Sequence, residues 1–160
     1  MIPYTIDKNN TYYCLAEDVH IDGKSAINFS SNLHIQNSTL DCQGHNLDGN
    51  RTKNTFGVFL VGGKTKNNII KNCNITNSNV GIFVKTGANE ITIVNNTFIN
   101  IDSQGIYFEG SSYYNNITNN TFINNGYAIY FGPSNSTITK NVVASNYHGF
   151  IVEDYNNISD

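Results

Sequence analysis

The sequence predicts an all-β chain that folds as a right-handed parallel β-helix of about five to six coils, each of about 20–24 residues, with an N-terminal cap. Three observations predict it: one pattern recurs along the chain, apolar residues alternate within it, and Asn-rich pairs interrupt it. Parallel crossover connections are almost always right-handed, which gives the expected hand. The copies begin at Ile70, Ile93, Ile117 and Ile138, with a fainter copy at Ile35 and the start of another at Ile158.

Residues 1–30 are expected to form the N-terminal cap and a first incomplete coil, and residues 31–160 the repeats. Because the chain stops as a further copy begins, we expect an open or truncated C-terminal end and a segment of a longer protein. No apolar run reaches the roughly 18 residues that span a bilayer, and no signal peptide opens the chain.

Aligned copies show four apolar columns, which predict the strands of each coil. Within each expected strand, inward apolar residues alternate with residues that point outward, as in a strand with one buried face. We place Ile35 and Ile70 in the first column, and Leu40 and Ile75 in the second. The other two columns follow a small residue, and they are Val58, Ile82, Ile106, Ile129, Phe150 and Leu60, Val84, Phe108, Phe131, Val152.

Asn-rich columns between the apolar ones predict tight bends. Asn adopts left-handed backbone conformations more readily than most residues, and its amide can hydrogen-bond to the same residue in the next coil. The predicted ladders are Asn37, Asn72, Asn95, Asn119, then Ser38, Asn96, Asn120, Asn141, and after the second column Asn77, Asn100, Asn124.

The stretch 43–53 is the one clear insertion, about 12 residues beyond the regular coil. His45 with Asp41 and Asp48 is a candidate for a weak metal or acid/base site, although Gly, Asn and Asp in this order are also ordinary turn residues. Asn50 is the candidate glycosylation acceptor. Other sequons arise because the repeated Asn bends create them.

Three Cys residues cannot all pair within one chain. A Cys14–Cys42 disulfide would tie the cap to the first coil, and three unbonded thiols in small-residue positions are the favoured alternative. Cys73 replaces an Asn in a bend ladder. No C-x-x-C spacing supports a zinc or redox site, so no metal or cofactor is expected.

Catalytic residues are not expected. The chain lacks the paired carboxylate motifs of polysaccharide hydrolases, and it has one Arg, Arg51. Lys85, Glu109 and Glu153 share one outward column, in which Lys85 and Glu109 would lie in adjacent coils. Their simplest role is an ion pair of a few tenths of a kcal/mol. A net charge of −3 without a Lys/Arg cluster disfavours nucleic-acid binding.

One outward column is aromatic, and it is the strongest candidate for a binding surface. At about 4.8 Å per coil, its members would form a flat stripe on the outside of the solenoid. Three interpretations of this column remain: a protein interface, a sugar-binding surface, or ring stacking that only stabilises the contact between coils. The members are Phe59, Phe83, Tyr107, Tyr130 and Ile151.

The repeat N-x-I-T-x-N-x-F-x-N…G-I-x-F resembles the parallel β-helix repeats of the NosD-like and "carbohydrate-binding and sugar hydrolysis" families. Residues 11–29 resemble the N-terminal edge of such domains. Such repeats are abundant in surface proteins of methanogenic archaea. The resemblance implies an extracellular, cell-surface structural or recognition segment, S-layer-like or adhesin-like, that associates with itself or another envelope protein. Alternatives are a polysaccharide-binding or -processing domain and a periplasmic copper-site assembly factor.

Overall fold

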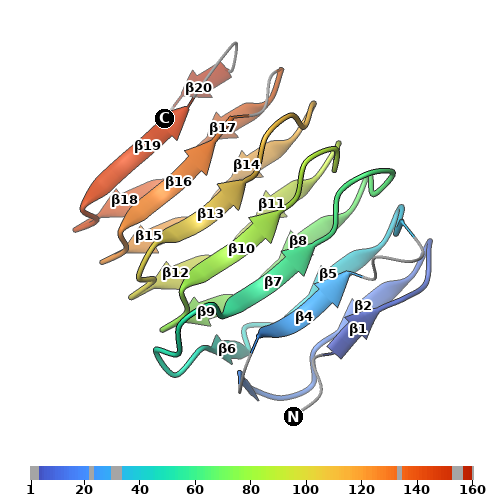
Figure 1. Cartoon of the computed structure of the whole chain (residues 1–160), viewed down its shortest axis with the longest axis horizontal. Coiled ribbons are helices and arrows are strands. Elements are labelled where there is room, and N and C mark those ends of the chain that lie inside the picture. Colours follow the sequence, from blue (N-terminus) through green and yellow to red (C-terminus); the bar gives the residue numbers. More distant parts are fainter. Residues whose placement is uncertain (1–3, 22–23, 30–33, 133–134, 153–156, 160) are drawn as a thin grey trace.

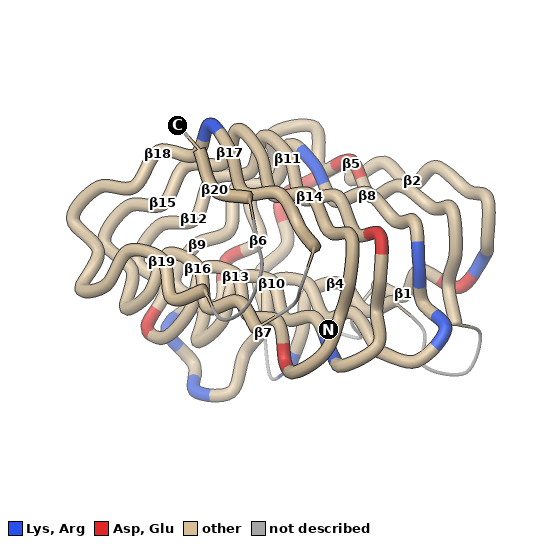
Figure 2. The backbone as a smooth tube through the Cα atoms, turned by 90° about the horizontal axis from the view of Figure 1, so that it is seen from above, with Lys and Arg blue, Asp and Glu red and all other residues tan. Residues whose placement is uncertain are grey.

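The chain is a parallel β-solenoid of about six coils, which confirms the predicted all-β class (Figure 1). The computed structural model describes residues 4–21, 24–29, 34–132, 135–152 and 157–159, and these contain strands and turns but no helix. Accordingly, no helix in these residues is long and apolar enough to cross a membrane. Seen from above, the coils stack as nested turns of similar outline (Figure 2).

Three parallel sheets, here named A, B and C, run along the stack. Sheet A contains β1 (Tyr4–Ile6), β4 (Ser25–Phe29), β7 (Phe56–Leu60), β10 (Val80–Val84), β13 (Gln104–Phe108), β16 (Tyr127–Phe131) and β19 (His148–Val152). Sheet B contains β2 (Tyr12–Cys14), β5 (Thr39–Asp41), β8 (Ile69–Lys71), β11 (Thr92–Val94), β14 (Asn116–Thr118), β17 (Thr137–Thr139) and β20 (Asn157–Ser159). Sheet C contains β3 (Val19–His20), β6 (Asn46–Asp48), β9 (Asn74–Thr76), β12 (Thr97–Ile99), β15 (Thr121–Ile123) and β18 (Val142–Ala144).

Each coil passes through sheets B, C and A in that order, and the same positions pair from coil to coil. In sheet A, Ile82 pairs with Val58 on one side and Ile106 on the other. The two apolar columns predicted for this sheet are therefore confirmed. The residues of the N-terminal segment also join the sheets, since β2 pairs with β5, β3 with β6 and β4 with β7.

The predicted alignment of the first repeat is wrong. Leu40 pairs with Ile70, and Leu47 with Ile75, so Leu40 occupies the first apolar column and Leu47 the second. Ile35 instead lies buried in the turn before β5. The cause is that inserted residues lengthen the turn 42–45, which separates the two columns in this coil more widely than in the others. Further inserted residues lie in the turn 49–55, between β6 and β7.

The inward columns of the three sheets form one narrow, fully buried core. In its centre, the rings of Phe98 and Phe122 stack with centroids 4.8 Å apart and planes 3° apart. Exposure rises at the two ends of the stack: Tyr13 is half-buried, and in the last coil Val143 and Phe150 are each 38% exposed. Coil-to-coil packing of identical positions therefore supplies the apolar burial that stabilises the fold.

The bends between sheets B and C contain two adjacent amide columns with different roles. The outer residue, such as Asn95, has φ near 57°, which Asn tolerates. The inner residue, Asn96, is 1% exposed and its side chain crosses to the neighbouring coil. Its Oδ1 accepts the N–H of Cys73 at 3.0 Å, and its Nδ2 donates to the carbonyl of Ile70 at 3.1 Å. Asn120 repeats this pattern one coil on.

Beyond the first coil, two predicted amide ladders are confirmed, Asn96–Asn120–Asn141 and Asn77–Asn100–Asn124. The outer column forms the predicted bends with positive φ, but hydrogen bonds between its amides do not join Asn72, Asn95 and Asn119. Asn37 does not stack on Asn72. Its amide donates to Asn10 and its Oδ1 accepts from Asn67, so it belongs to the turns between sheets A and B. Ser38 lies in that turn column too, because its N–H donates to the side chain of Asn68. This is the same register error that displaced Leu40.

Both expectations for the cysteines are wrong. Cys42 bonds to Cys73, and Cys14 is free and exposed. The two bonded residues are the bend residues of adjacent coils, with Cα atoms 4.7 Å apart, which is the spacing of neighbouring strands. Since the N–H of Cys73 bonds to Asn96, the disulfide replaces an amide hydrogen bond at one step of the inner column.

The small residues at the second position of the sheet A strands, such as Gly81 in β10, lead to a stability prediction. A Cβ on Gly81 would lie 2.6 Å from the Phe98 ring and would collide with the carbonyl of Gly105, whereas Gly149 in the same column has nothing within 4 Å. We therefore expect Gly81→Ala to lower the free energy of unfolding by about 2 kcal/mol through overpacking, and Gly149→Ala to change it by less than about 0.5 kcal/mol. Urea denaturation measures both, and equal effects would contradict this packing.

Candidate functional site

The predicted aromatic column lies on the outer surface of sheet A, in register across adjacent coils. Phe83 pairs with Phe59 and with Tyr107, and Tyr130 continues the column. The rings of Phe59 and Phe83 stack at 5.4 Å between centroids. Those of Phe83 and Tyr107 meet edge to face at 5.1 Å, and those of Tyr107 and Tyr130 at 5.5 Å. Ile151 pairs with Tyr130 and ends the column.

These side chains are less exposed than alternation alone predicts. Phe83 is only 9% exposed, and Phe59, Tyr107, Tyr130 and Ile151 are half-buried. The reason is that neighbouring rings shield one another from solvent. The ring of Phe56 also packs against them, with its centroid 5.5 Å from that of Phe59 and 5.3 Å from that of Phe83. Stacking between coils is thus one role that the column has, and only the outer surfaces of its rings are open to a partner.

Sequence reasoning missed a second outward column at the start of the sheet A strands. Phe56, Val80, Gln104, Tyr127 and His148 pair in register there. The ring of Tyr127 packs against Tyr130 at 6.1 Å and stacks on His148 at 4.5 Å. This column could have been found in the sequence, because each of its members directly precedes the Gly or Ala of the repeat. Phe56, Phe59, Phe83, Tyr107, Tyr127 and Tyr130 together are called the aromatic face below.

Two opposite charges flank the aromatic face in adjacent coils. Lys85 follows β10 and Glu109 follows β13, and their backbones are held by hydrogen bonds to Leu60 and Val84. Lys85 is exposed and Glu109 half-buried. The expected ion pair between them does not form: the ion pairs of the described residues are His20–Asp48, His45–Asp18 and Lys71–Asp41. The third predicted member, Glu153, lies outside the described residues.

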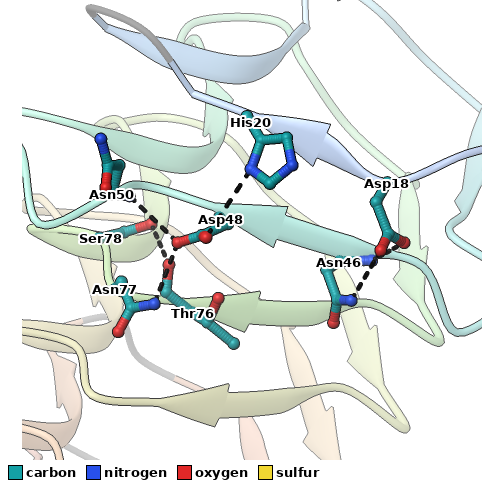
Figure 3. A network of polar contacts seen from close by, with 8 residues as sticks. All are labelled: Asp18, His20, Asn46, Asp48, Asn50, Thr76, Asn77 and Ser78. Carbon is teal, nitrogen blue, oxygen red and sulfur yellow. Dashed lines mark hydrogen bonds and ion pairs between the residues drawn. The ribbon is translucent and has the colours of Figure 1, made fainter.

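The insertion contributes to a polar network on the outside of sheet C (Figure 3). His45 Nδ1 lies 3.2 Å from Asp18 Oδ1, and Asn46 donates to Asp18 through both its backbone and its side chain. These hydrogen bonds, those from Asn46 first, lower the pKa of Asp18. Asp48 accepts from the N–H of Asn50 and the amide of Asn77, while His20 lies 3.8 Å away.

The predicted grouping of His45 with Asp41 and Asp48 is therefore wrong. Asp41 belongs to sheet B. His20 pairs with Asp48 and His45 with Asp18, in each case an acid of the adjacent coil. Pairing Val19 with Leu47 brings Asp18 and His20 beside β6, which only the corrected register reveals. Within the described ranges, no three His, Cys, Asp or Glu side chains are grouped to hold a metal ion.

Sequence reasoning also missed a charged cluster on sheet B. Asp41 is 7% exposed and accepts hydrogen bonds from the Tyr12 hydroxyl, the Asn72 amide and the N–H of Gln43. Lys71 Nζ lies 3.3 Å from its Oδ2 and over the Tyr12 ring, 5.1 Å from the centroid. Burial would raise the pKa of Asp41, but these hydrogen bonds outweigh it and lower the pKa to about 2.

A polar groove of about 450 Å³ runs along the turns that join sheets C and A. The longer turn 49–55 places Arg51 at one end, where its N–H bonds to the carbonyl of Asn77. Tyr147, 84% exposed, lies at the other end. Lys and Arg residues, and Asp and Glu residues, are spread along much of the stack (Figure 2). The groove is lined by Arg51, Asn100, Ile101, Asp102, Asn124, Asn125, Gly126, Ser145, Asn146 and Tyr147.

The Asp41 cluster predicts a pH dependence of stability. Because the pKa of Asp41 is about 2 in the folded protein and 3.8 otherwise, its contribution is complete above pH 3.8 and is lost as the pH falls through 2. We expect the loss of unfolding free energy between pH 4.5 and pH 2 to be smaller by about 2 kcal/mol in Asp41→Asn than in the wild type. Urea titrations at several pH values measure this, with Asp102→Asn as the exposed control. An unchanged acid limb in Asp41→Asn would contradict it.

Comparison with known proteins agrees with this architecture. The sequence model of a right-handed β-helix region matches residues 4–159. No match was found among curated proteins or among solved structures. The match supports the parallel β-helix part of the resemblance seen in the sequence, and it covers all the coils described above. The chain belongs to the family of proteins with a right-handed β-helix region.

Proposed function

We propose that the chain is a structural or recognition segment of a cell-surface protein, S-layer-like or adhesin-like, and that its aromatic face supports protein assembly. The partner is a second copy or another envelope protein. The observation that carries the proposal is the aromatic face itself, which extends over four adjacent coils of sheet A.

Two physical arguments support this function. Aromatic residues are enriched in the cores of protein interfaces, and rings already fixed by stacking lose little conformational freedom on binding. The contacts of Phe59, Phe83 and Tyr107 fix these rings within the free protein. The Cys42–Cys73 disulfide supports an extracellular location, because structural disulfides persist in oxidising compartments.

Sedimentation velocity over a range of concentrations tests the assembly. We expect the wild type to show reversible, concentration-dependent oligomers, and the double variant Phe59→Ser/Tyr130→Ser to require at least about tenfold higher concentration. This corresponds to about 1.4 kcal/mol of lost association free energy. Both side chains are half-buried, so thermal melts must show that the variant stays folded.

The matched control is Tyr113→Ser, which removes a 43% exposed ring in the turn after β13, away from the aromatic face. It should assemble like the wild type. A wild type that stays monomeric up to millimolar concentration would overturn assembly through copies of this chain. If another envelope protein is the partner, its capture in a pull-down should be lost in Phe59→Ser/Tyr130→Ser, and capture by this variant would overturn the role of the aromatic face.

The polar groove favours polysaccharide binding as a second function. Amide side chains such as Asn100 and Asn124 can donate to and accept from sugar hydroxyls, and the exposed ring of Tyr147 can stack on a sugar face. Arg51 would pair with the carboxylate of an acidic sugar. No specific observation favours the third reading, a copper-site assembly factor.

Isothermal titration with neutral and uronic-acid oligosaccharides tests the groove. We expect uronic-acid oligomers to bind more tightly than neutral ones, and Arg51→Ala and Tyr147→Ala each to weaken binding by about tenfold, the loss of one charge-assisted hydrogen bond or one stacked ring. Lys53→Ala removes an exposed cation from the same turn and should not matter. Absence of binding by the wild type at millimolar sugar would refute the second function.

A further inference from the structure

We propose that the partner of the aromatic face is a second copy of this chain, packed face to face with its solenoid axis antiparallel. The two-fold axis runs parallel to the strands and lies between β10 and β13. This inference rests on the proposed assembly function and adds the partner, its orientation and the pairs of residues that meet.

The order of side chains on sheet A fits this symmetry. A two-fold axis along the strands reverses the order of the coils and keeps each position along the strand. Phe83 therefore faces Tyr107 of the second copy, and Phe59 faces Tyr130 of the second copy. In the second outward column Phe56 likewise faces Tyr127 of the second copy. Every ring thus meets another ring.

The flanking charges decide between orientations. Lys85 and Glu109 occupy the same strand position in the two coils that the axis exchanges. Lys85 of each copy then faces Glu109 of the other, which creates two ion pairs for side chains that have none within the described chain. With parallel solenoid axes the strand direction reverses. Lys85 then lies opposite the start of β10, next to Asn79, while Glu109 lies opposite the start of β13, close to the exposed acid Asp102.

The size of the face sets the expected strength. Four strands at about 4.8 Å and five residues at about 3.3 Å give a patch of roughly 19 by 16 Å, or about 300 Å² on each copy. The two copies would bury roughly 600 Å² in total, which is below the about 1,200–2,000 Å² of stable interfaces and typical of weak, transient contacts, so we expect dissociation constants from micromolar to millimolar. In such a contact, charge complementarity selects the orientation, because like charges placed opposite each other are costly.

Charge reversal tests the pairing. Lys85→Glu places two acids opposite each other in both of these pairs, and Glu109→Lys places two cations opposite each other in both. We expect each variant alone to raise the dissociation constant of the dimer by at least about tenfold in sedimentation velocity. An equimolar mixture of the two variants should dimerise within about threefold of the wild type, because each copy then presents the charges that the other needs.

The mixture distinguishes antiparallel pairing from an effect of the substitution within a single chain. Each variant chain carries the same charges alone and in the mixture, so only a contact between the two chains can restore dimerisation. Lys64→Glu, which makes the same charge change at an exposed turn, is the control and should not alter dimerisation. If the aromatic double variant abolishes association while the mixture shows no rescue, assembly stands and the antiparallel pairing is overturned. A monomeric wild type would overturn both.

Discussion

The structure depends on one constraint: each coil must repeat the one before it in register, and buried side-chain amides enforce this at several bends. Asn96 shows how, because it satisfies a backbone N–H and a carbonyl of the preceding coil from a buried position. An unsatisfied buried backbone group costs about 1–3 kcal/mol, so a coil shifted by one residue would be strongly disfavoured. One step earlier in the stack, the disulfide between Cys42 and Cys73 joins adjacent coils covalently at the same bend.

In-register stacking also explains the outer surface. A residue that points outward in one coil meets its counterpart in the next, so aromatic positions become stacks of rings and amide positions become ladders. The aromatic face and the polar groove are therefore two results of one repeat, on two sides of the solenoid. Specificity for a partner must come from residues that differ from coil to coil. At the aromatic face these are Lys85 and Glu109, and at the polar groove it is Arg51 in the longer turn.

The repeat alone predicted the fold class, the inward columns from Ile70 onward and the amide bends, because these recur at nearly constant spacing. It misplaced the first coil because Ile35 and Leu40 imitate the spacing of the two columns, while Leu47 stands farther away. That error hid the disulfide and the pairing of Asp18 with His45. The column of Phe83 was predicted, but its partial burial was not, since alternation describes direction and not how far neighbouring rings cover each other.

The most direct test compares the free energies of unfolding of Asn96→Ala and Asn95→Gly, adjacent residues of one bend. The inner substitution leaves the buried N–H of Cys73 without an acceptor and removes the side-chain hydrogen bond to the carbonyl of Ile70, so we predict a loss of about 2 kcal/mol. Gly adopts the φ of 57° at position 95 without strain, so the outer substitution should cost less than about 1 kcal/mol. Equal losses, or a loss below about 1 kcal/mol for Asn96→Ala, would contradict the claim that the inner amides hold the coils in register.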